Sequence, residues 1–355
     1  MQRKIKNKIN ILPKGWRKVR LGDWIELKYG FRLSEKKRIK GDVPVFGSSG
    51  ILGWHNKPAV KKEGIIIGRK GNVGAVYFSE KPFYPIDTVY FIDSLKKTGD
   101  LKFFYYLLKT INFQKVDINV GVPGLNRDTA HDLEILIPEN LDEQKRIAEI
   151  LSAFDEKIEL NNKINKTLEE MAQAIFKEWL SKNQKSNTKK QKLNEFAIIS
   201  YGHGPSSSEL TKIGYPVYGA NGIIGYSDSY NFLDRQIIIG CRGVVGNVTL
   251  TLPQCSVTHN SLVITPRNGR KIFLYYLLRN QNLNSIVSGS VQPQITIKDL
   301  GQLELLIPDE KFQEKFESMV STIEQKRLMI FYENQTLAAL RDLLLPKLMS
   351  GEIRV

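Results

Sequence analysis

Cysteine and histidine are scarce in this sequence. Its 355 residues include two cysteines, Cys241 and Cys255. The four histidines are His55, His131, His203 and His259. Neither residue type has the spacing of a zinc site, and the histidines are too scattered for a catalytic triad. We therefore expect no metal and no catalytic residues. The sequence leaves a disulfide between the cysteines open but favours reduced, buried thiols, because no secretory signal is recognisable.

Long apolar runs and several enzyme motifs are also absent. The N-terminus is basic without an apolar core segment, and no run elsewhere could span a membrane, so we expect a cytoplasmic protein. There is no Gly-Lys-Ser/Thr phosphate loop and no Asn/Asp-Pro-Pro-Tyr/Phe motif of adenine methyltransferases. A nuclease-like run, Pro308 to Lys311, lies where a helix should begin. Because acidic residues favour the positive end of a helix dipole, we interpret it as a cap.

Acidic residues are outnumbered by basic ones. The chain has 37 Asp and Glu against 52 Lys and Arg, a formal net charge of +15. The first forty residues are the most basic part, and their acids are Asp23, Glu26 and Glu35. Their basic residues are Arg3, Lys4, Lys6, Lys8, Lys14, Arg17, Lys18, Arg20, Lys28, Arg32, Lys36, Lys37, Arg38 and Lys40. An excess of this size indicates a polyanionic partner, most often nucleic acid, and a basic solvated surface is the alternative.

The chain repeats itself with an offset of about 170 residues. PVFGSSGILGW (44–54) returns as PVYGANGIIGY (216–226), and IIIGRKGNVGAV (65–76) returns as IIIGCRGVVGNV (237–248). FYYLLK (104–109) returns as LYYLLR (274–279), and INKTLEEM (164–171) as ENQTLAAL (333–340). Offsets this constant indicate duplication of a whole unit.

Each repeat combines a mixed globular region with a long helix. Strands are expected at Val43 to Phe46, Gly64 to Ile67, Ala75 to Phe78 and Thr88 to Ile92, and helices at Leu101 to Lys109 and Ile272 to Arg279. The fold class is α+β, with two similar globular domains separated by two long antiparallel helices in a coiled coil, pseudo-twofold symmetric. The expected segments are 1–138 (first globular domain), 139–182 (helix), 183–192 (flexible lysine-rich linker), 193–308 (second globular domain) and 309–355 (helix).

Both long helices have an apolar seam of heptad period. In the first helix the seam residues are Ile147, Leu151, Phe154, Ile158, Asn161, Asn165, Leu168 and Ile175. In the second helix they are Phe316, Ile323, Ile330, Asn334, Leu337 and Leu344. The asparagines are typical of seam positions that fix register and partner. Pro346 should kink or end the second helix.

Two similar domains on a rigid spacer suit a target with two parts at a fixed distance, such as duplex DNA. Positions alike in both domains should build the frame or contact phosphate, and positions that differ should read bases. A basic residue recurs at Lys70 and Arg242, which we assign to phosphate. The remaining DNA-binding candidates are Ser48, Ser49, His55, Arg69, Asn72, Asn126, Arg127, Asn221, Gln292 and Gln294, because their side chains suit base edges in the major groove. Each could equally be an exposed polar loop residue.

Several segments resemble the specificity subunit of type I restriction-modification systems. They are LPKGWRKVRLGD (12–23), the two glycine-rich stretches, IPENLDEQKRIAEIL (137–151) and LLLPKLMSGEI (343–353). The resemblance implies two target-recognition domains, each binding half of a bipartite double-stranded DNA site. It also implies helical regions that bind two methyltransferase subunits, which the restriction subunits join. The second domain has no equivalent of the Pro-Lys-Gly-Trp opening.

This resemblance implies no cofactor in the chain itself, with S-adenosylmethionine, ATP and Mg expected on partner subunits. We expect no activity from the chain alone and no membrane partner. Two other classes remain open: a divergent nuclease subunit, which would cut DNA unaided, and a non-catalytic coiled-coil DNA-binding adaptor of another restriction or defence system, which would bind without sequence preference.

Overall fold

The computed structural model describes residues 12–116, 124–183, 188–289 and 292–355. The chain divides into two compact units: unit 1 comprises residues 1–160 and 334–355, and unit 2 comprises residues 161–333. Each unit contains one globular region and a stretch of both long helices. The basic residues Arg3, Lys4, Lys6 and Lys8 lie outside the described residues.

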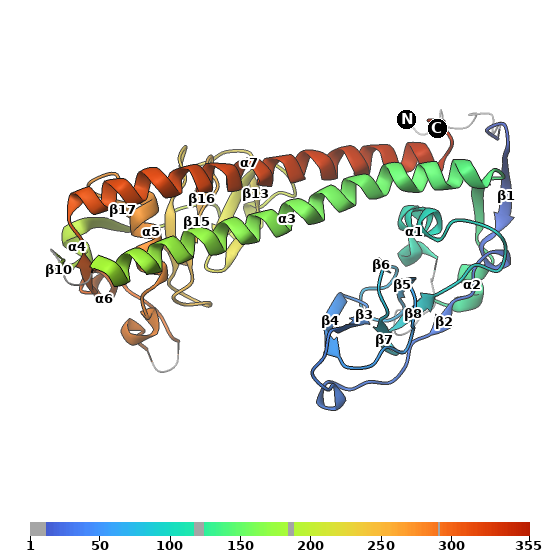
Figure 1. The fold of residues 1–355 in the computed structure, drawn as a ribbon, viewed down its shortest axis with the longest axis horizontal. Helices are drawn as coiled ribbons and strands as arrows, with labels where there is room; N and C mark the ends of the chain where they lie inside the picture. Colours follow the sequence, from blue (N-terminus) through green and yellow to red (C-terminus); the bar gives the residue numbers. More distant parts are fainter. Residues whose placement is uncertain (1–11, 117–123, 184–187, 290–291) are drawn as a thin grey trace. The chain divides into compact units, whose positions relative to one another are not determined.

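The globular region of unit 1 is built from three small sheets (Figure 1). β1 (Trp16–Arg20) pairs antiparallel with β9 (Glu134–Pro138), which joins the beginning of the region to its end. The other sheets have the orders β2-β8-β5-β6 and β4-β3-β7. Their strands are β2 (Lys28–Tyr29), β3 (Val43–Gly47), β4 (Gly50–His55), β5 (Gly64–Gly68), β6 (Val76–Ser79), β7 (Tyr84–Pro85) and β8 (Val89–Ile92). The helices are α1 (Leu101–Thr110) and α2 (Arg127–His131), with 3-10 turns at Leu21–Asp23, Glu35–Lys37 and Phe113–Lys115.

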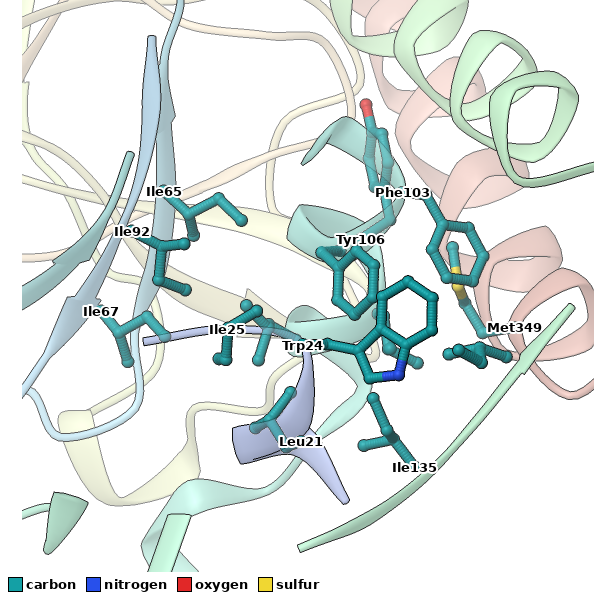
Figure 2. Close-up of a cluster of buried hydrophobic side chains, with 14 of the residues drawn as sticks. Leu21, Trp24, Ile25, Ile65, Ile67, Ile92, Phe103, Tyr106, Ile135 and Met349 are labelled. Atoms are coloured by element: carbon teal, nitrogen blue, oxygen red, sulfur yellow. The ribbon is translucent and has the colours of Figure 1, made fainter. Parts of the chain in front are cut away.

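One apolar core connects this region to the long helices. The central strand β5 lies between β8 and β6, and its β-branched run is buried on both faces, as such a position requires. Ile65 and Ile67 of β5 face Phe103 and Tyr106 of α1, and Met349 of the last long helix joins the same cluster (Figure 2). The sheet, α1 and the end of the chain therefore fold as one body in unit 1.

Unit 2 repeats this architecture strand by strand. Its sheets have the orders β10-β18, β11-β17-β14-β15 and β13-β12-β16, which match those of unit 1 position for position. The strands are β10 (Lys189–Lys192), β11 (Ala197–Tyr201), β12 (Tyr215–Gly219), β13 (Gly222–Ser227), β14 (Ile237–Gly240), β15 (Val248–Leu250), β16 (Ser256–Val257), β17 (Ser261–Pro266) and β18 (Glu304–Ile307). The helices are α4 (Leu193–Phe196), α5 (Lys271–Arg279) and α6 (Ile297–Gly301), with 3-10 turns at Ser207–Glu209 and Leu283–Ile286. The predicted duplication and the α+β class are confirmed.

The lysine-rich segment before unit 2's first helix corrects one prediction. We expected a flexible linker over residues 183–192, but Lys189–Lys192 forms β10 and pairs antiparallel with β18. Residues 184–187 lie outside the described residues. β10 occupies the place of β1 in unit 1, although it shares no sequence with the Pro-Lys-Gly-Trp opening. The prediction was wrong because the strand gains its hydrogen bonds from a partner more than a hundred residues away.

The two long helices are α3 (Leu141–Asn183) and α7 (Glu310–Met349). In unit 1 the first half of α3 lies beside the last part of α7, where Asp155 pairs with Arg341. In unit 2 the second half of α3 lies beside the first part of α7, where Glu169 pairs with Arg327. Within each unit the pairing is therefore antiparallel. Asp309 accepts from the Phe312 amide (2.8 Å), so the nuclease-like run is a helix cap as predicted.

The apolar seam differs in detail from a strict heptad. All predicted seam residues are buried or half-buried, and Asn161 donates to Glu333 (3.0 Å). However, the predicted Ile175 is only half-buried, whereas its neighbour Phe176 is fully buried against Phe273 and Phe316. A helix with 3.6 residues per turn drifts away from a 3.5-residue repeat, so the buried face moves by a residue. Pro346 lies in the last turn of α7, which ends at Met349, close to the predicted end.

Candidate nucleic-acid interface

A glycine-rich turn joins β5 to β6 in unit 1 and β14 to β15 in unit 2. In unit 1 the turn runs from Gly68 to Gly74, and the Gly74 amide donates to the Gly68 carbonyl (2.8 Å). Gly71 and Gly74 have φ of +75° and +79°, which disfavours any residue with a side chain. In unit 2, Gly243 and Gly246 have φ of +76° and +83°. The glycines thus determine the backbone shape of the turn, as the sequence predicted. The side chains of its other residues are not needed for that shape and can bind a ligand.

Three loops meet around this turn in unit 1. The amides of Arg69 and Lys70 both donate to the Thr88 carbonyl (2.9 and 3.1 Å), which holds the turn against the loop before β8. The Arg69 carbonyl accepts from the Leu125 amide (2.9 Å), which brings the segment ahead of α2 alongside. The β3–β4 turn adjoins from the other side, because a Cβ on Gly71 would lie 3.0 Å from the Ser48 hydroxyl. The fold therefore gathers Ser48, Arg69, Lys70 and the start of α2 into one surface.

Two arginine side chains stack on one exposed tyrosine in this surface. The guanidinium groups of Arg69 and Arg127 lie 5.4 and 5.5 Å from the ring centre of Tyr29, which is 51% exposed. Arg69 also stacks on Tyr90 (5.8 Å) and donates to the Asp87 carbonyl (2.6 Å). Cation–π contacts of this kind are worth about 0.5–1 kcal/mol each at exposed sites. They orient both guanidinium groups before any ligand binds.

The ring of Tyr90, on which Arg69 also stacks, is held in place by a hydrogen bond. Burial raises the pKa of the Tyr90 phenol above its ordinary value, so the phenol stays protonated, and it donates to the Leu125 carbonyl (3.0 Å). This bond joins β8 to the segment that carries Asn126 and Arg127.

Unit 2 builds the same surface from different side chains. Arg242 lies 6.0 Å from the ring of Tyr201, which occupies the place of Tyr29 and is also exposed. The position of Arg69 is taken by Cys241, which is fully buried, and burial raises the pKa of its thiol. Ile297 stands where unit 1 has Arg127. The second surface therefore has one oriented guanidinium where the first has two, together with apolar groups.

Some predicted candidates have structural partners instead. His55 is buried, and its Nδ1 accepts from the Ile39 amide (3.0 Å) at the far end of β4. The Asn126 side chain caps α2 by accepting from the Asp128 and Thr129 amides (2.9 and 3.1 Å). Asn221 accepts from Asn247 at 3.4 Å. These three contacts argue against a base-reading role for His55 and leave Asn126 and Asn221 with only part of their hydrogen-bonding capacity.

The remaining candidates lie at the surface. Ser49, Lys70, Asn72 and Gln292 are exposed, and Gln294 is half-buried with its backbone paired to Ser288. Sequence reasoning missed the two tyrosines, although Tyr29–Gly30 and Tyr201–Gly202 recur at the same offset as the glycine-rich turns. A search for repeated aromatic residues beside the turn would have found them.

Cys241 and Cys255 are both free and buried. Within the described parts of the chain, no group of three or more His, Cys, Asp or Glu side chains is arranged to hold a metal ion. The helices among those same residues are each too short or too polar to cross a bilayer.

Comparison with known proteins identifies the family. A family model described as "Type I restriction modification DNA specificity domain" matches residues 13–170 and again residues 185–332. The chain belongs to this family of type I specificity subunits and contains its target-recognition domain twice.

Type I specificity subunits from other organisms align with nearly the whole chain. The "Type I restriction enzyme MjaIX specificity subunit" of Methanocaldococcus jannaschii is 25% identical over 417 residues, covering 98% of this chain and 95% of that protein. The "Putative type I specificity subunit S.MgeORF438P" of Mycoplasma genitalium is 27% identical over 374 residues, covering 97% and 95%. The crystal structure of a type I restriction-modification S subunit from M. genitalium aligns with a TM-score of 0.65 and 23% identity over 98% of both chains, which shows a shared fold.

Proposed function

We propose that this chain reads an asymmetric, bipartite DNA site, with one recognition domain on each half-site. The observation that carries the proposal is the duplicated three-loop surface with unlike side chains. Unit 1 presents Arg69 and Arg127, whereas Cys241 and Ile297 stand at the matched positions of unit 2. Arginine reads guanine through O6 and N7, whereas an apolar side chain such as Ile297 suits the thymine methyl; Cys241 is buried and contributes no base contact. Two domains with the same fold but different side chains at the matched surface positions should read two different DNA sequences.

Phosphate contacts are assigned to groups that recur or stay exposed. Lys70 and Arg242 occupy the same position of the turn in both domains and are both exposed. The loop 32–40 adds Arg32, Lys36, Lys37 and Lys40, all exposed, and the net charge of the whole chain is +15. Such groups give affinity that falls with salt and carries no sequence information.

We further propose that the chain binds the partner subunits implied by its family. The two long helices would bind two methyltransferase subunits, and restriction subunits would join through them. Catalysis, S-adenosylmethionine, ATP and Mg would belong to those partners. The recognition domains would span residues 1–138 and, with β10 included, residues from 189 to 308. The segments 139–182 and 309–355 would form the spacer.

The decisive experiment is selection of random duplex DNA by the full chain together with its methyltransferase subunits. We expect two unlike half-sites separated by a constant gap, and sequencing of modified adenines in the host should return the same site. Binding without any sequence preference would favour a structural adaptor. DNA cleavage by the purified chain alone would favour a nuclease.

A further inference from the structure

Among the polar side chains that attach each recognition domain to the long helices, two recur at matched positions in both units; all four are buried except Asp155, which is half-buried. In unit 1 these groups are Gln144 and Asp155, both on α3, and in unit 2 they are Gln313 and Glu324, both on α7. In either helix the two groups are eleven residues apart, which is close to three full turns. They therefore lie on the same helix face, about 16 Å apart along the axis.

The glutamine forms the first attachment. Gln144 is 1% exposed; its Oε1 accepts from the Asp100 amide (3.1 Å) and its Nε2 donates to the Pro138 carbonyl (3.0 Å). Gln313 is 3% exposed; its Oε1 accepts from Asn268 (2.8 Å) and its Nε2 donates to the Pro308 carbonyl (2.8 Å). A buried amide with both ends occupied cannot rotate without leaving a polar group unpaired.

A tyrosine hydroxyl bonded to a carboxylate forms the second attachment. Tyr106 of α1 donates to Asp155 Oδ2 (2.7 Å), and Tyr276 of α5 donates to Glu324 Oε1 (2.7 Å). Both tyrosines are buried, and burial raises the pKa of each phenol above its ordinary value, so each remains a donor. The same bond thus forms twice, from the equivalent helix of each domain.

Each carboxylate is also linked to the second long helix, directly in unit 1 and through an arginine in unit 2. In unit 1 Asp155 pairs with Arg341 of α7 at 2.5 Å. In unit 2 Glu324 pairs with Arg327 (2.7 Å), whose guanidinium reaches Glu169 of α3 (2.8 Å). Burial acts to raise the pKa of Glu324, but Arg327, Tyr276 and Arg235 together hold it below the ordinary value. Each network therefore joins a recognition domain to both helices at once.

We propose that these four groups, Gln144, Asp155, Gln313 and Glu324, set the angle of each recognition domain on the helix pair. Through that angle they determine how many base pairs are accepted between the two half-sites. The shared apolar core holds each domain on the helices, but apolar packing is non-directional, whereas two hydrogen-bonded attachments on the same helix face fix the angle of the domain. Because a turned domain would meet its half-site in the wrong register, these are positioning residues that do not touch DNA. The inference rests on the proposed reading of a bipartite site.

The test measures gap selectivity in the full chain bound to its methyltransferase subunits. Selection from random duplex DNA first gives the two half-sites and the natural gap. Binding is then measured on duplexes whose gap is changed by one or two base pairs. The double variant Tyr106→Phe, Tyr276→Phe removes the tyrosine hydroxyl from the second attachment of each domain. Both carboxylates stay paired with arginine, and the glutamine attachments are unchanged. We expect its preference for the natural gap to fall by about fivefold for each of the two hydrogen bonds removed, with both half-site sequences unchanged.

The neighbouring tyrosines are the matched control. The Tyr105 hydroxyl accepts from Lys109 (3.3 Å) and the Tyr275 hydroxyl from Arg279 (2.9 Å), both within their own helices. Arg279 also pairs with Glu169 of α3, and removal of the Tyr275 hydroxyl leaves both members of that pair in place. Tyr105→Phe with Tyr275→Phe should therefore keep the gap preference of the parent chain. The double variant Gln144→Met, Gln313→Met, which removes the other attachment, should relax the gap as the phenylalanine pair does.

Two failures are distinguishable. If the parent chain selects no split sequence, the proposed function is wrong. If the parent selects a split sequence with a constant gap and both attachment variants keep that gap selectivity, the positioning role is overturned while the proposed function stands. An equal relaxation in the Tyr105, Tyr275 control would also overturn it.

Discussion

Arginine side chains in the first recognition domain are ordered before DNA binds. Arg69 and Arg127 share Tyr29, and Arg69 is held by Asp87 as well. An arginine fixed in advance loses less side-chain entropy when it meets a base, which favours selective contacts over loose ones. The buried thiol of Cys241 at the matched position cannot do the same.

Replacing Arg69 with alanine should alter the preferred sequence at one half-site only. We expect a loss of about 1–3 kcal/mol for the preferred base there, because a bidentate guanine contact would be removed. Cys241→Ala is the matched control and should change neither half-site. Binding measured over single-base variants of the selected site gives the answer, and an equal loss on every sequence would assign Arg69 to phosphate.

Replacing Arg242 with alanine should weaken binding to all sequences alike. The exposed guanidinium recurs as Lys70 in the first domain, so we expect a phosphate contact and a salt slope smaller by about 0.9. Binding constants at several salt concentrations would measure that slope. A new sequence preference with the same slope would contradict the assignment.

His131 should make the first domain sensitive to acid. Its Nε2 accepts from the Leu27 amide (3.1 Å), and burial, followed by the charges of Lys96 and Arg127, lowers its pKa. The unfolded chain takes up this proton near pH 6.5, but the folded chain resists it. The stabilisation is therefore present above about pH 6.5 and is lost as the pH falls through the lower folded pKa.

Hydrogen exchange at the Leu27 amide measures this effect directly. Protection should fall between pH 7.5 and pH 5.5 by more than intrinsic exchange predicts, and His131→Gln should remove that dependence. The exposed His203 serves as the control, because His203→Gln should leave it intact. Protection that is equal at both pH values in the parent chain would show that His131 stays neutral without cost.

At the scale of elements, burial of the long helices follows their tertiary neighbours as much as their own pattern. Phe176 packs against the globular region through Phe273 and Tyr276 and against α7 through Phe316. α3 therefore buries two faces in unit 2, one against its partner helix and one against the sheet and α5. A two-stranded coiled-coil pattern describes only the first.

Phe176→Ala should destabilise unit 2 strongly. Removing a fully buried ring leaves a cavity, which costs about 3–5 kcal/mol. Met171, on the same helix but half exposed, is the control, and Met171→Ala should cost less than about 0.5 kcal/mol. Urea unfolding followed by tryptophan fluorescence, to which Trp179 beside Phe316 contributes, would measure both. Similar losses in the two variants would show that position 176 is not in the core.

At the scale of the whole molecule, the chain contains two copies of the same unit. The core of each copy includes residues from both long helices. Unit 1 needs Met349 and Arg341 from the end of the chain, and unit 2 needs Phe316 and Glu324 from the start of α7. Neither recognition domain is thus independent of the helix pair, which suits a protein proposed to measure a distance on DNA.

Lengthening both helices should lengthen the gap between half-sites. Insertion of one heptad between Leu160 and Asn161 and one between Glu333 and Asn334 adds about 10 Å, the length of about three base pairs. We expect methylome sequencing to show the same two half-sites at a wider separation. Insertion into α3 alone should break the pairing within a unit and abolish the site. An unchanged gap in the double insertion would refute the spacer role.

The repeats within the sequence determine the duplicated layout of the chain, although not every strand. The offset of about 170 residues, the helical period of α3 and α7 and the strands around the glycine-rich turns all follow from patterns between near neighbours or between copies. Such patterns survive in one sequence because backbone geometry imposes them locally. The family followed from the same segments.

The tertiary structure alone determines which residues far apart in the sequence come into contact. The pairing of β10 with β18, the burial of His55 against Ile39, the stacking of Arg69 on Tyr29 and the bond from Tyr106 to Asp155 each depend on a partner chosen by folding. A polar side chain carries no local mark of whether it will cap, pair or face solvent, because that outcome depends on which groups the tertiary structure brings within about 3 Å.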